Sequence, residues 1–184
     1  MTIKLNAQQL RETDENVAQE QSKDISRNEI TIILENVYDT YNVGGIFRLA
    51  DALCVKHLYL CGEMEIPPNP RIQKSSIGTY KIVPWSYKST TSEAIEEIRS
   101  QQPKTSIVAI EQDKKSKPYN EIQYNFPIAL ISGNETYGIL PETLDLVDAT
   151  AEIPMWGVNK SLNIIVATAI VSYEAMKFMP TNKY

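Results

Sequence analysis

A short polar stretch directly before a long apolar segment carries the residues best suited to hold a ligand. The stretch from Ile153 to Asn163 reads Ile-Pro-Met-Trp-Gly-Val-Asn-Lys-Ser-Leu-Asn and leads into an apolar run that ends near Phe178. The run is apolar on nearly every side, which predicts a helix buried in the core or against a partner chain. Ser161 stands where that helix needs its first side-chain acceptor, so helix capping alone would explain it. Ser161 and Asn163 also lie where a ligand could be held, and both explanations stay open.

Two other segments place polar residues and glycines in a similar way. Asn42–Arg48 reads Asn-Val-Gly-Gly-Ile-Phe-Arg within a predicted helix, and Ile131–Gly138 reads Ile-Ser-Gly-Asn-Glu-Thr-Tyr-Gly after a predicted strand. Ligands of open α/β sheets bind outside the carboxyl ends of the strands, so we expect the three segments to converge there. The second segment has the glycine spacing of a P-loop, but Ile139 and Leu140 replace its Lys and Ser/Thr, which excludes a Walker phosphate site.

The elements that must position these residues alternate along the chain. The pattern predicts strands over 30–37, 56–61, 80–83, 105–110, 127–132 and 151–153, and helices over 43–54, 90–101, 141–147 and the final apolar run. Strands that are apolar throughout and alternate with helices predict an α/β fold, an open and mostly parallel sheet with helices on both faces. Residues 1–28 are polar and charge-mixed, so we expect an N-terminal arm or loosely docked helix before a single domain over 29–184.

The composition narrows the class of protein. A chain of 184 residues suits one domain with a substantial core. No stretch approaches 18 uninterrupted apolar residues and the N-terminus lacks a signal-peptide core, so we expect a cytoplasmic protein with no membrane partner. Cys54 and Cys61 are predicted to be free thiols. Because His57 is the only histidine, no metal site is expected.

The charge pattern gives evidence both for and against the binding of nucleic acid. A net charge of −5 and a pI near 5.0 count against a nucleic-acid binder, whose affinity comes largely from phosphate neutralisation. Residues 66–92 nevertheless contain no Asp or Glu, and this window holds four basic residues with aromatic residues between them: Arg71, Lys74, Lys81 and Lys88, with Tyr80, Trp85 and Tyr87. Bases can stack on such aromatic rings. The window is therefore the predicted RNA-binding surface, and Lys114, Lys115 and Lys117 form a second candidate.

The three polar segments together resemble the motifs of the SpoU/TrmH branch of the SPOUT RNA methyltransferases. Asn42–Arg48 resembles the first motif, Ile131–Gly138 the second and Pro154–Asn163 the third, in the family's order. The resemblance covers residues 30–178, and residues 66–78 also look like a segment common in this branch. Gly45 and Cys54 depart from it, where Ala and Gly are common. The resemblance implies that residues from about 127 to 178 form a deep trefoil knot, against the general rule that chains are not knotted.

The resemblance also implies a reaction and a cofactor. Members transfer the methyl group of S-adenosylmethionine to a ribose 2′-oxygen of RNA, and they bind the cofactor in the knot. Matching the motif positions assigns the cofactor pocket to Gly133, Ile153, Met155, Leu162 and the backbone of Ser161. Glu111, which follows a predicted strand, is expected at the rim of that pocket.

The remaining motif residues are assigned to the reacting nucleotide. By resemblance Arg48 lies nearest to the attacking oxygen, but a guanidinium, which is permanently protonated in proteins, is a poor general base. We therefore expect Arg48 to stabilise the developing alkoxide or to hold the adjacent phosphate. Asn42 is expected to orient Arg48 or the ribose, and Glu135 to anchor its loop through backbone amides. Ser161 and Asn163 are expected to contact the nucleotide.

Three functions remain as alternatives. The leading one is a homodimeric RNA ribose 2′-O-methyltransferase that uses no metal, with tRNA slightly favoured over rRNA, and the nearly all-apolar last helix favours dimerisation. The second is an RNA-binding or assembly protein that keeps the fold without turnover. The third is an RNA base methyltransferase.

Overall fold

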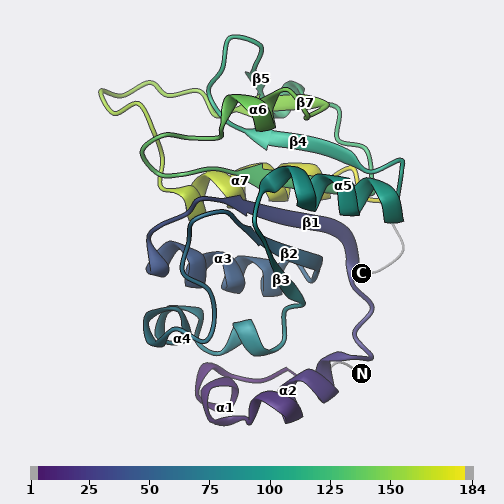
Figure 1. Cartoon of the computed structure of the whole chain (residues 1–184), viewed down its shortest axis with the longest axis vertical. Coiled ribbons are helices and arrows are strands. Elements are labelled where there is room, and N and C mark those ends of the chain that lie inside the picture. Colours follow the sequence, from purple (N-terminus) through teal and green to yellow (C-terminus); the bar gives the residue numbers. More distant parts are fainter. Residues whose placement is uncertain (1–3, 181–184) are drawn as a thin grey trace.

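The computed structural model describes residues 4–180, which form one seven-stranded sheet (Figure 1). All strand pairs are parallel, and the order across the sheet is β3-β2-β1-β6-β4-β7-β5. The bounds are Asn28–Glu35 for β1, Val55–Cys61 for β2, Trp85–Lys88 for β3, Ser106–Ile110 for β4, Lys117–Pro118 for β5, Ile128–Ser132 for β6 and Ala149–Glu152 for β7. The strand order reverses direction beside β1, because β2 and β3 lie on one side of it and β6, β4, β7 and β5 on the other. The predicted open parallel α/β sheet is confirmed.

Helices cover both faces of this sheet, as predicted. On one face lie α3 (Thr40–Ala52) and α7 (Ile164–Met176), and on the other lie α5 (Thr91–Gln101) and α6 (Pro141–Leu144). The shorter elements are α1 (Ala7–Glu12), α2 (Glu15–Ser22), α4 (Pro70–Ser76) and the 3-10 turns η1 (Thr79–Lys81) and η2 (Tyr119–Glu121). Within residues 4–180, no helix has the length and apolar character that crossing a membrane requires.

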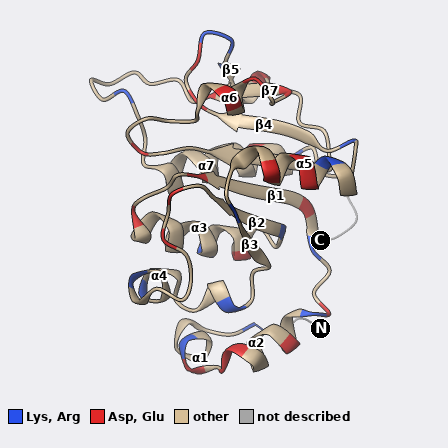
Figure 2. Ribbon diagram, in the orientation of Figure 1, with Lys and Arg blue, Asp and Glu red and all other residues tan. Residues whose placement is uncertain are grey.

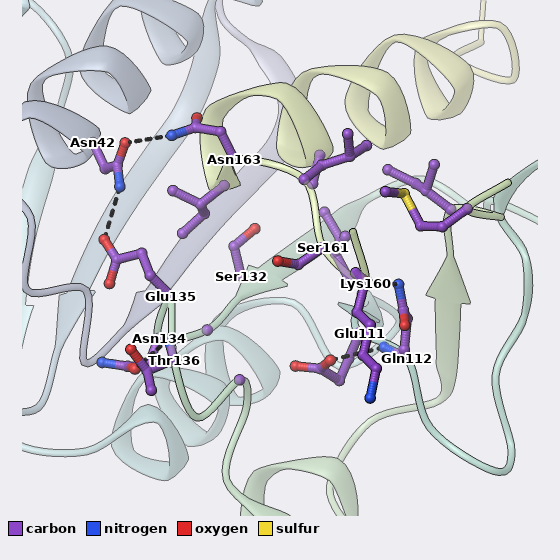
Figure 3. A pocket seen from close by; sticks show the side chains of 18 of the residues that line it. Asn42, Glu111, Gln112, Ser132, Asn134, Glu135, Thr136, Lys160, Ser161 and Asn163 are labelled. Carbon is purple, nitrogen blue, oxygen red and sulfur yellow. Dashed lines mark hydrogen bonds between the residues drawn. The ribbon is translucent and has the colours of Figure 1, made fainter. Parts of the chain in front are cut away.

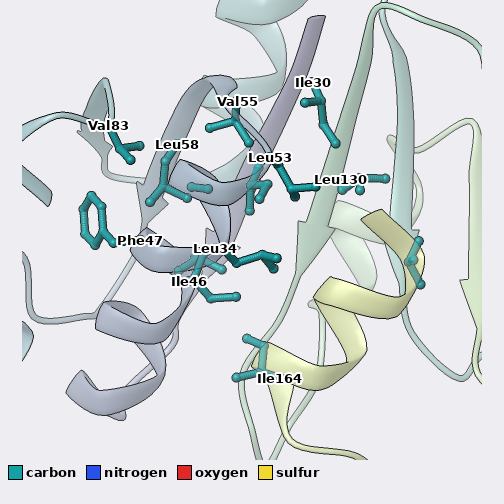
Figure 4. Close-up of a cluster of buried hydrophobic side chains, with 14 of the residues drawn as sticks. Ile30, Leu34, Ile46, Phe47, Leu53, Val55, Leu58, Val83, Leu130 and Ile164 are labelled. Carbon is teal, nitrogen blue, oxygen red and sulfur yellow. The ribbon is translucent and has the colours of Figure 1, made fainter. Parts of the chain in front are cut away.

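The core occupies both sides of β1 because both faces of this strand are apolar. Ile30, Ile32 and Leu34 are fully buried under α3 and α7 (Figure 4), whereas Ile33 points to the α5 face. This pattern follows from a parallel sheet covered by helices on each side. Cys61 is a buried free thiol, and burial raises its pKa to about 12, so it stays protonated.

One predicted strand is wrong and one strand of the sheet was not predicted. Residues 80–83 do not form a strand, because Tyr80 lies in η1, and the strand begins later, at Trp85. The rings of Tyr80 and Trp85 both pack edge-on against Phe47, so these two aromatics serve the core and are not free for base stacking. The short edge strand β5 was not predicted, since two residues carry no periodic signal.

The N-terminal residues fold back as two short helices held by a lysine. The ammonium of Lys81 donates to the carbonyl oxygens of Thr13 at 2.7 Å, Arg11 at 3.1 Å and Leu10 at 3.5 Å, at the end of α1. Arg27 donates from Nη2 to the carbonyl of Ile82 at 2.7 Å. Lys81 therefore fastens the end of α1 beside η1, and Arg27 fastens the segment between α2 and β1 to the residue that follows η1. Residues 1–3 of the predicted arm lie outside the described part of the chain.

Helices α3 and α4 pack closely because two small residues face each other. A Cβ added to Gly44 would lie 1.9 Å from Ser75 Oγ and 2.8 Å from the backbone nitrogen of Ser76. A Cβ on the neighbouring Gly45 would instead meet Ile165 Cδ1 at 2.2 Å, the far end of a flexible side chain. Although Gly44 and Gly45 lie in the same helix, substitution of one meets backbone and substitution of the other meets a movable side chain.

We predict that Gly44→Ala destabilises the protein and Gly45→Ala does not. Alanine in a helix interior gains about 1 kcal/mol over glycine, but at position 44 the overlap with the α4 backbone costs about 1–3 kcal/mol more than that gain. Chemical denaturation of both variants measures the difference. Equal stability of the two variants would contradict the close α3–α4 approach.

Candidate functional site

A cavity of about 770 Å³ opens at the carboxyl edge of the sheet, where the strand order reverses. Its walls come from segments that follow three strands: residues 110–112 after β4, residues 132–138 at the end of β6, and residues 153–163 after β7. The beginnings of α3 and α7 close one side. This is the edge at which open α/β sheets bind ligands, and all three motif segments meet there as predicted.

A chain of side-chain hydrogen bonds joins the three segments (Figure 3). Asn163 Nδ2 donates to Asn42 Oδ1 at 3.0 Å, and Asn42 Nδ2 donates to Glu135 Oε1 at 2.9 Å. Glu135 also accepts the backbone amides of Tyr38 and Asp39, each at 3.3 Å. The amide contacts that the sequence predicted for Glu135 are therefore present, and they tie the β6 loop to the start of α3.

The loop after β6 is folded tightly on itself. Asn134 and Gly138 exchange backbone hydrogen bonds of 3.0 and 2.9 Å, and Asn134 Oδ1 accepts the amides of Thr136 and Tyr137. A Cβ on Gly133 would lie 2.4 Å from the backbone carbon of Gly138, and Gly138 itself has φ +70°. The glycines are thus required by the loop's own backbone, and not only by the close approach of a ligand.

Glu111 fixes the other end of this loop. Its Oε2 accepts the amide of Ile139 at 2.9 Å, and its Oε1 accepts the amide of Gln112 at 2.8 Å. Glu111 is half-buried and lines the cavity. The predicted rim residue is therefore part of the wall, with both oxygens engaged by backbone donors.

The structure brings together nearly all of the predicted site residues. Those that line the cavity are Asn42, Glu111, Gly133, Glu135, Ile153, Met155, Ser161, Leu162 and Asn163. The helix cap is Asn163, whose Oδ1 accepts the amide of Ile165 at 2.9 Å, so of the two explanations left open for Ser161 the capping of α7 is wrong. The Ser161 side chain makes no hydrogen bond within residues 4–180 and is exposed at the cavity, free to contact a ligand.

Arg48 is the exception among the motif residues. It lies on α3 six positions beyond Asn42, is exposed, and is not part of the cavity wall. Its position off the apolar face of the helix agrees with the sequence pattern. Within the described residues it forms no ion pair, so its guanidinium is available to a ligand.

The four basic residues of the acid-free window lie outside the cavity and differ in their contacts. Lys81 is engaged by the α1 carbonyls, and Lys88 forms an ion pair with Glu97. Arg71 and Lys74 are exposed on α4, where Figure 2 shows basic residues. Of the window's residues, these two have the freedom that phosphate contacts need.

Several cavity residues were not predicted. Asn134, Thr136, Ser132, Gln112 and Lys160 all line it. Ser132 Oγ is 2.7 Å from Thr168 Oγ1 on α7, and Gln112 Nε2 donates to the Lys160 carbonyl at 2.8 Å. Asn134, Thr136 and Ser132 stand inside the second motif and Lys160 inside the third, so motif membership was a usable signal. For Gln112 the only signal was its place after a strand.

Carboxylates outnumber cations in the cavity wall. Asp39, Glu111 and Glu135 line it, and Lys160 is the one Lys or Arg among the described residues that does so. Ile153, Met155 and Leu162 add apolar surface on the side of the β7 loop. The arrangement suits a ligand with a flat apolar part and positive charge. No group of three or more His, Cys, Asp or Glu side chains within 4–180 is placed to hold a metal ion.

Comparison with known proteins places the chain beside RNA-modifying enzymes. The model of the SpoU rRNA Methylase family matches residues 29–173. The chain is 29% identical over 152 residues to the tRNA (guanosine(18)-2′-O)-methyltransferase of Thermus thermophilus, covering 81% of this chain and 75% of that protein. The enzyme of the same name from Aquifex aeolicus is 30% identical, with coverages of 81% and 69%.

A solved structure shows the same arrangement. The AdoMet-bound rRNA methyltransferase from Sinorhizobium meliloti superposes with a TM-score of 0.76 at 27% identity. The superposition covers 94% of this chain but only 61% of the Sinorhizobium protein, so the latter contains a further part that this chain does not match.

The hydrogen-bond chain predicts a pH-dependent defect in Asn42→Asp. At position 42, which is 6% exposed, a carboxylate would replace the amide that donates to Glu135. Two carboxylates in contact raise the pKa of one of them in the folded state, so the folded protein binds more protons than the unfolded chain. The variant should lose about 1–3 kcal/mol at a pH of about 7.5 and regain stability as the pH falls toward about 5.

The control for this prediction is Asn42→Ala, which removes the amide without adding a charge. Denaturant titrations at both pH values should show a deficit for Asn42→Ala that changes little with pH. A deficit of Asn42→Asp that stays constant with pH would contradict the contact between position 42 and Glu135.

Proposed function

The chain belongs to the SpoU rRNA methylase family, and we propose that it transfers the methyl group of S-adenosylmethionine to a ribose 2′-hydroxyl of RNA. The family match confirms the resemblance that the three motifs indicated. The observation that carries the proposal is that these motifs build one cavity, whose wall contains every residue that the resemblance assigned to the cofactor. The Thermus and Aquifex relatives are tRNA methyltransferases, which favours tRNA over rRNA as the substrate. We propose that the enzyme acts on such RNA in the cytoplasm, which cell fractionation would test.

The residues of the cavity fit S-adenosylmethionine. When bound, the cofactor supplies a methyl group on a positively charged sulfonium. The excess of carboxylates over cations in the wall favours such a cation, and Ile153, Met155 and Leu162 offer apolar contact for a flat adenine. Ser161 has a free hydroxyl at the same place. We assign these residues, with Gly133 and Glu111, to cofactor binding.

We propose a positioning role for Asn42, Glu135 and Asn163. Asn42 uses its amide oxygen and a hydrogen of its amide nitrogen to join the other two, and Asn163 also caps α7. Their hydrogen-bonding capacity is thus largely used within the protein. They serve catalysis by holding the loops at fixed distances, because a small misplacement of the reacting groups lowers the rate strongly.

We propose that Arg48 acts on charge that develops at the ribose or on the neighbouring phosphate. Its five N–H donors and permanent charge suit both tasks. Because it lies outside the cavity wall, it acts once RNA extends from the cavity mouth over α3. Arg71 and Lys74, exposed on α4, supply phosphate contacts along that path, because α4 packs directly on α3. The contacts of Lys81 and Lys88 within the protein favour structural roles for these two residues.

We also propose that the enzyme is a homodimer. Helix α7 buries Ile164, Thr168, Val171 and Ala175 along one face, yet its other side exposes Val166 (47%) and Tyr173 (55%). Exposed apolar area of this kind is typical of a subunit interface. Sedimentation analysis should give twice the 20.8 kDa mass of the chain.

A trefoil knot over residues 127 to 178 is the further part of the fold that we propose. Two features support it. Strand β6 lies between β1 and β4 although β4 precedes it in the chain, and α7 returns to pack on α3 and β6. An experimental structure whose traced chain straightens when pulled from both ends would contradict the knot.

Nucleoside analysis tests the proposed reaction. Mass spectrometry of tRNA and rRNA from cells that lack the protein should show the loss of one 2′-O-methylnucleoside, and the purified protein with S-adenosylmethionine should restore it. Loss of a base-methylated nucleoside would identify a base methyltransferase instead. An unchanged nucleoside profile, together with no heat of cofactor binding in calorimetry, would refute the proposed function.

A second prediction separates chemistry from RNA binding. Arg48→Ala should change stability by less than about 0.5 kcal/mol, because the side chain is exposed, and should lower the single-turnover rate at saturating RNA about a hundredfold or more. Arg48→Lys should rescue poorly if both prongs of the guanidinium are used.

The comparison variant is Arg71→Glu with Lys74→Glu. It should weaken RNA binding and flatten the log–log salt dependence by about 0.7–0.9 per lost phosphate contact, with the rate at saturating RNA unchanged. If Arg48→Ala and Arg48→Lys both keep the wild-type turnover, Arg48 has no part in the mechanism. A wild-type salt slope in the double variant would place the RNA path elsewhere, with Lys114, Lys115 and Lys117 as the next candidates.

A further inference from the structure

A second cavity, of about 520 Å³, opens on the same edge of the sheet. It lies beyond the ends of β1, β2 and β3, between the start of α5 and α6, whereas the cofactor cavity lies beyond β4, β6 and β7. Tyr38 lines both cavities, so only the loop after β1 separates them. The two cavities are therefore close enough for an RNA whose ribose reaches the first to place a neighbouring base in the second.

Exposed aromatic and apolar side chains line this second cavity. Tyr38 is 52% exposed and Tyr87 is 46% exposed, and both contribute to the wall together with Leu140, which is 37% exposed. Tyr87 is the one aromatic residue of the acid-free window that the core does not use. Flat π-faces at a cavity wall are the surfaces on which nucleobases stack.

The charged groups of this cavity are carboxylates, which accept hydrogen bonds and repel phosphate. Glu63 and Glu142 line it and are exposed, and no Lys or Arg is among its described lining residues. Within residues 4–180 neither carboxylate takes part in a hydrogen bond or ion pair. The third carboxylate, Glu35, is buried and already holds α6 through the Leu140 amide at 2.7 Å and the Thr143 hydroxyl. The two free carboxylates thus call for a ligand with N–H donors.

From this geometry we propose that the second cavity binds an unpaired nucleobase of the substrate RNA, in or directly beside the methylated nucleotide, and that it prefers guanine. The inference rests on the proposed function, since it assumes that RNA lies over this edge. Guanine carries two adjacent donors, N1–H and the N2 amine, which match the two oxygens of one carboxylate. Adenine and cytosine offer one amine, and uracil offers one imino N–H, so each satisfies a carboxylate less well.

Binding of short RNAs with one variable base tests this proposal. The probes are labelled pentanucleotides of uridine with guanosine, inosine, adenosine, cytidine or uridine at the centre, titrated with the cofactor product S-adenosylhomocysteine present. Inosine lacks only the N2 amine. Wild-type protein should bind the guanosine probe about tenfold more tightly than the inosine or uridine probe, as expected for one additional charge-assisted hydrogen bond.

Variants of the cavity should remove this preference in a specific way. The double variant Glu63→Gln with Glu142→Gln should bind the guanosine and inosine probes equally. Its overall affinity for the probes should not fall, because the variant has lost negative charge that repels phosphate. Tyr87→Ala should weaken the binding of every probe about tenfold, since stacking does not depend on the base. The matched control is Glu96→Gln, which removes the same charge from an exposed position of α5 outside the cavity, and it should keep the preference.

Two results would overturn the proposal. One is a wild-type protein that binds all probes alike, and the other is a guanosine preference that survives in the double glutamine variant. Methyl transfer to RNA by the same preparation distinguishes these outcomes from failure of the proposed function. A protein that methylates RNA but shows no base preference refutes the second site alone.

Discussion

Backbone amides held by carboxylates are the interaction on which this site depends. Glu35 ends β1, Glu111 follows β4, and Glu135 lies in the loop after β6. Each accepts backbone N–H groups from a segment that crosses above the sheet: Leu140 for Glu35, Ile139 for Glu111, and Tyr38 with Asp39 for Glu135. Hydrogen bonds to an ionised acceptor are stronger than neutral ones. Three acids at the ends of three strands thereby fix the loops that form the cavity wall.

This use of charge constrains the mechanism. A carboxylate whose oxygens already accept backbone donors is a poor candidate for a general base, because taking a proton would cost it those bonds. The single histidine of the chain lies on β2, away from the cavity wall. The groups that we propose to act on the reacting atoms are the Ser161 hydroxyl, Lys160 and Arg48. Such a set would act through orientation and the stabilisation of charge rather than as a strong internal base.

The sequence was sufficient for the central elements and insufficient where tertiary contacts decide. The apolar runs at β1, β2, β4 and β6 could be predicted because buried parallel strands are apolar on both faces. The start of β3 could not, because Tyr80 lies in η1 with its ring against Phe47, and the strand begins only at Trp85, which pairs with Leu58. Ser161 resembled a helix cap, but Asn163, which also reaches Asn42, took that role. The free or engaged state of Lys81 and Lys88 likewise depends on partners distant in sequence, which no local pattern reveals.

Carboxylates that hold the wall of the first cavity and those that have no partner differ in how much their replacement costs the fold. Asn42 lies 93 positions from Glu135 and 121 from Asn163 in sequence, so these contacts fix segments that are distant along the chain. Replacing an acid that holds such a junction leaves amides unpaired and moves the cavity wall. Glu63 and Glu142 hold nothing within the described chain, so their replacement costs the fold little. A protein built in this way keeps its methyl-donor cavity rigid, while the neighbouring cavity is free to vary with the base that lies beside the reacting ribose.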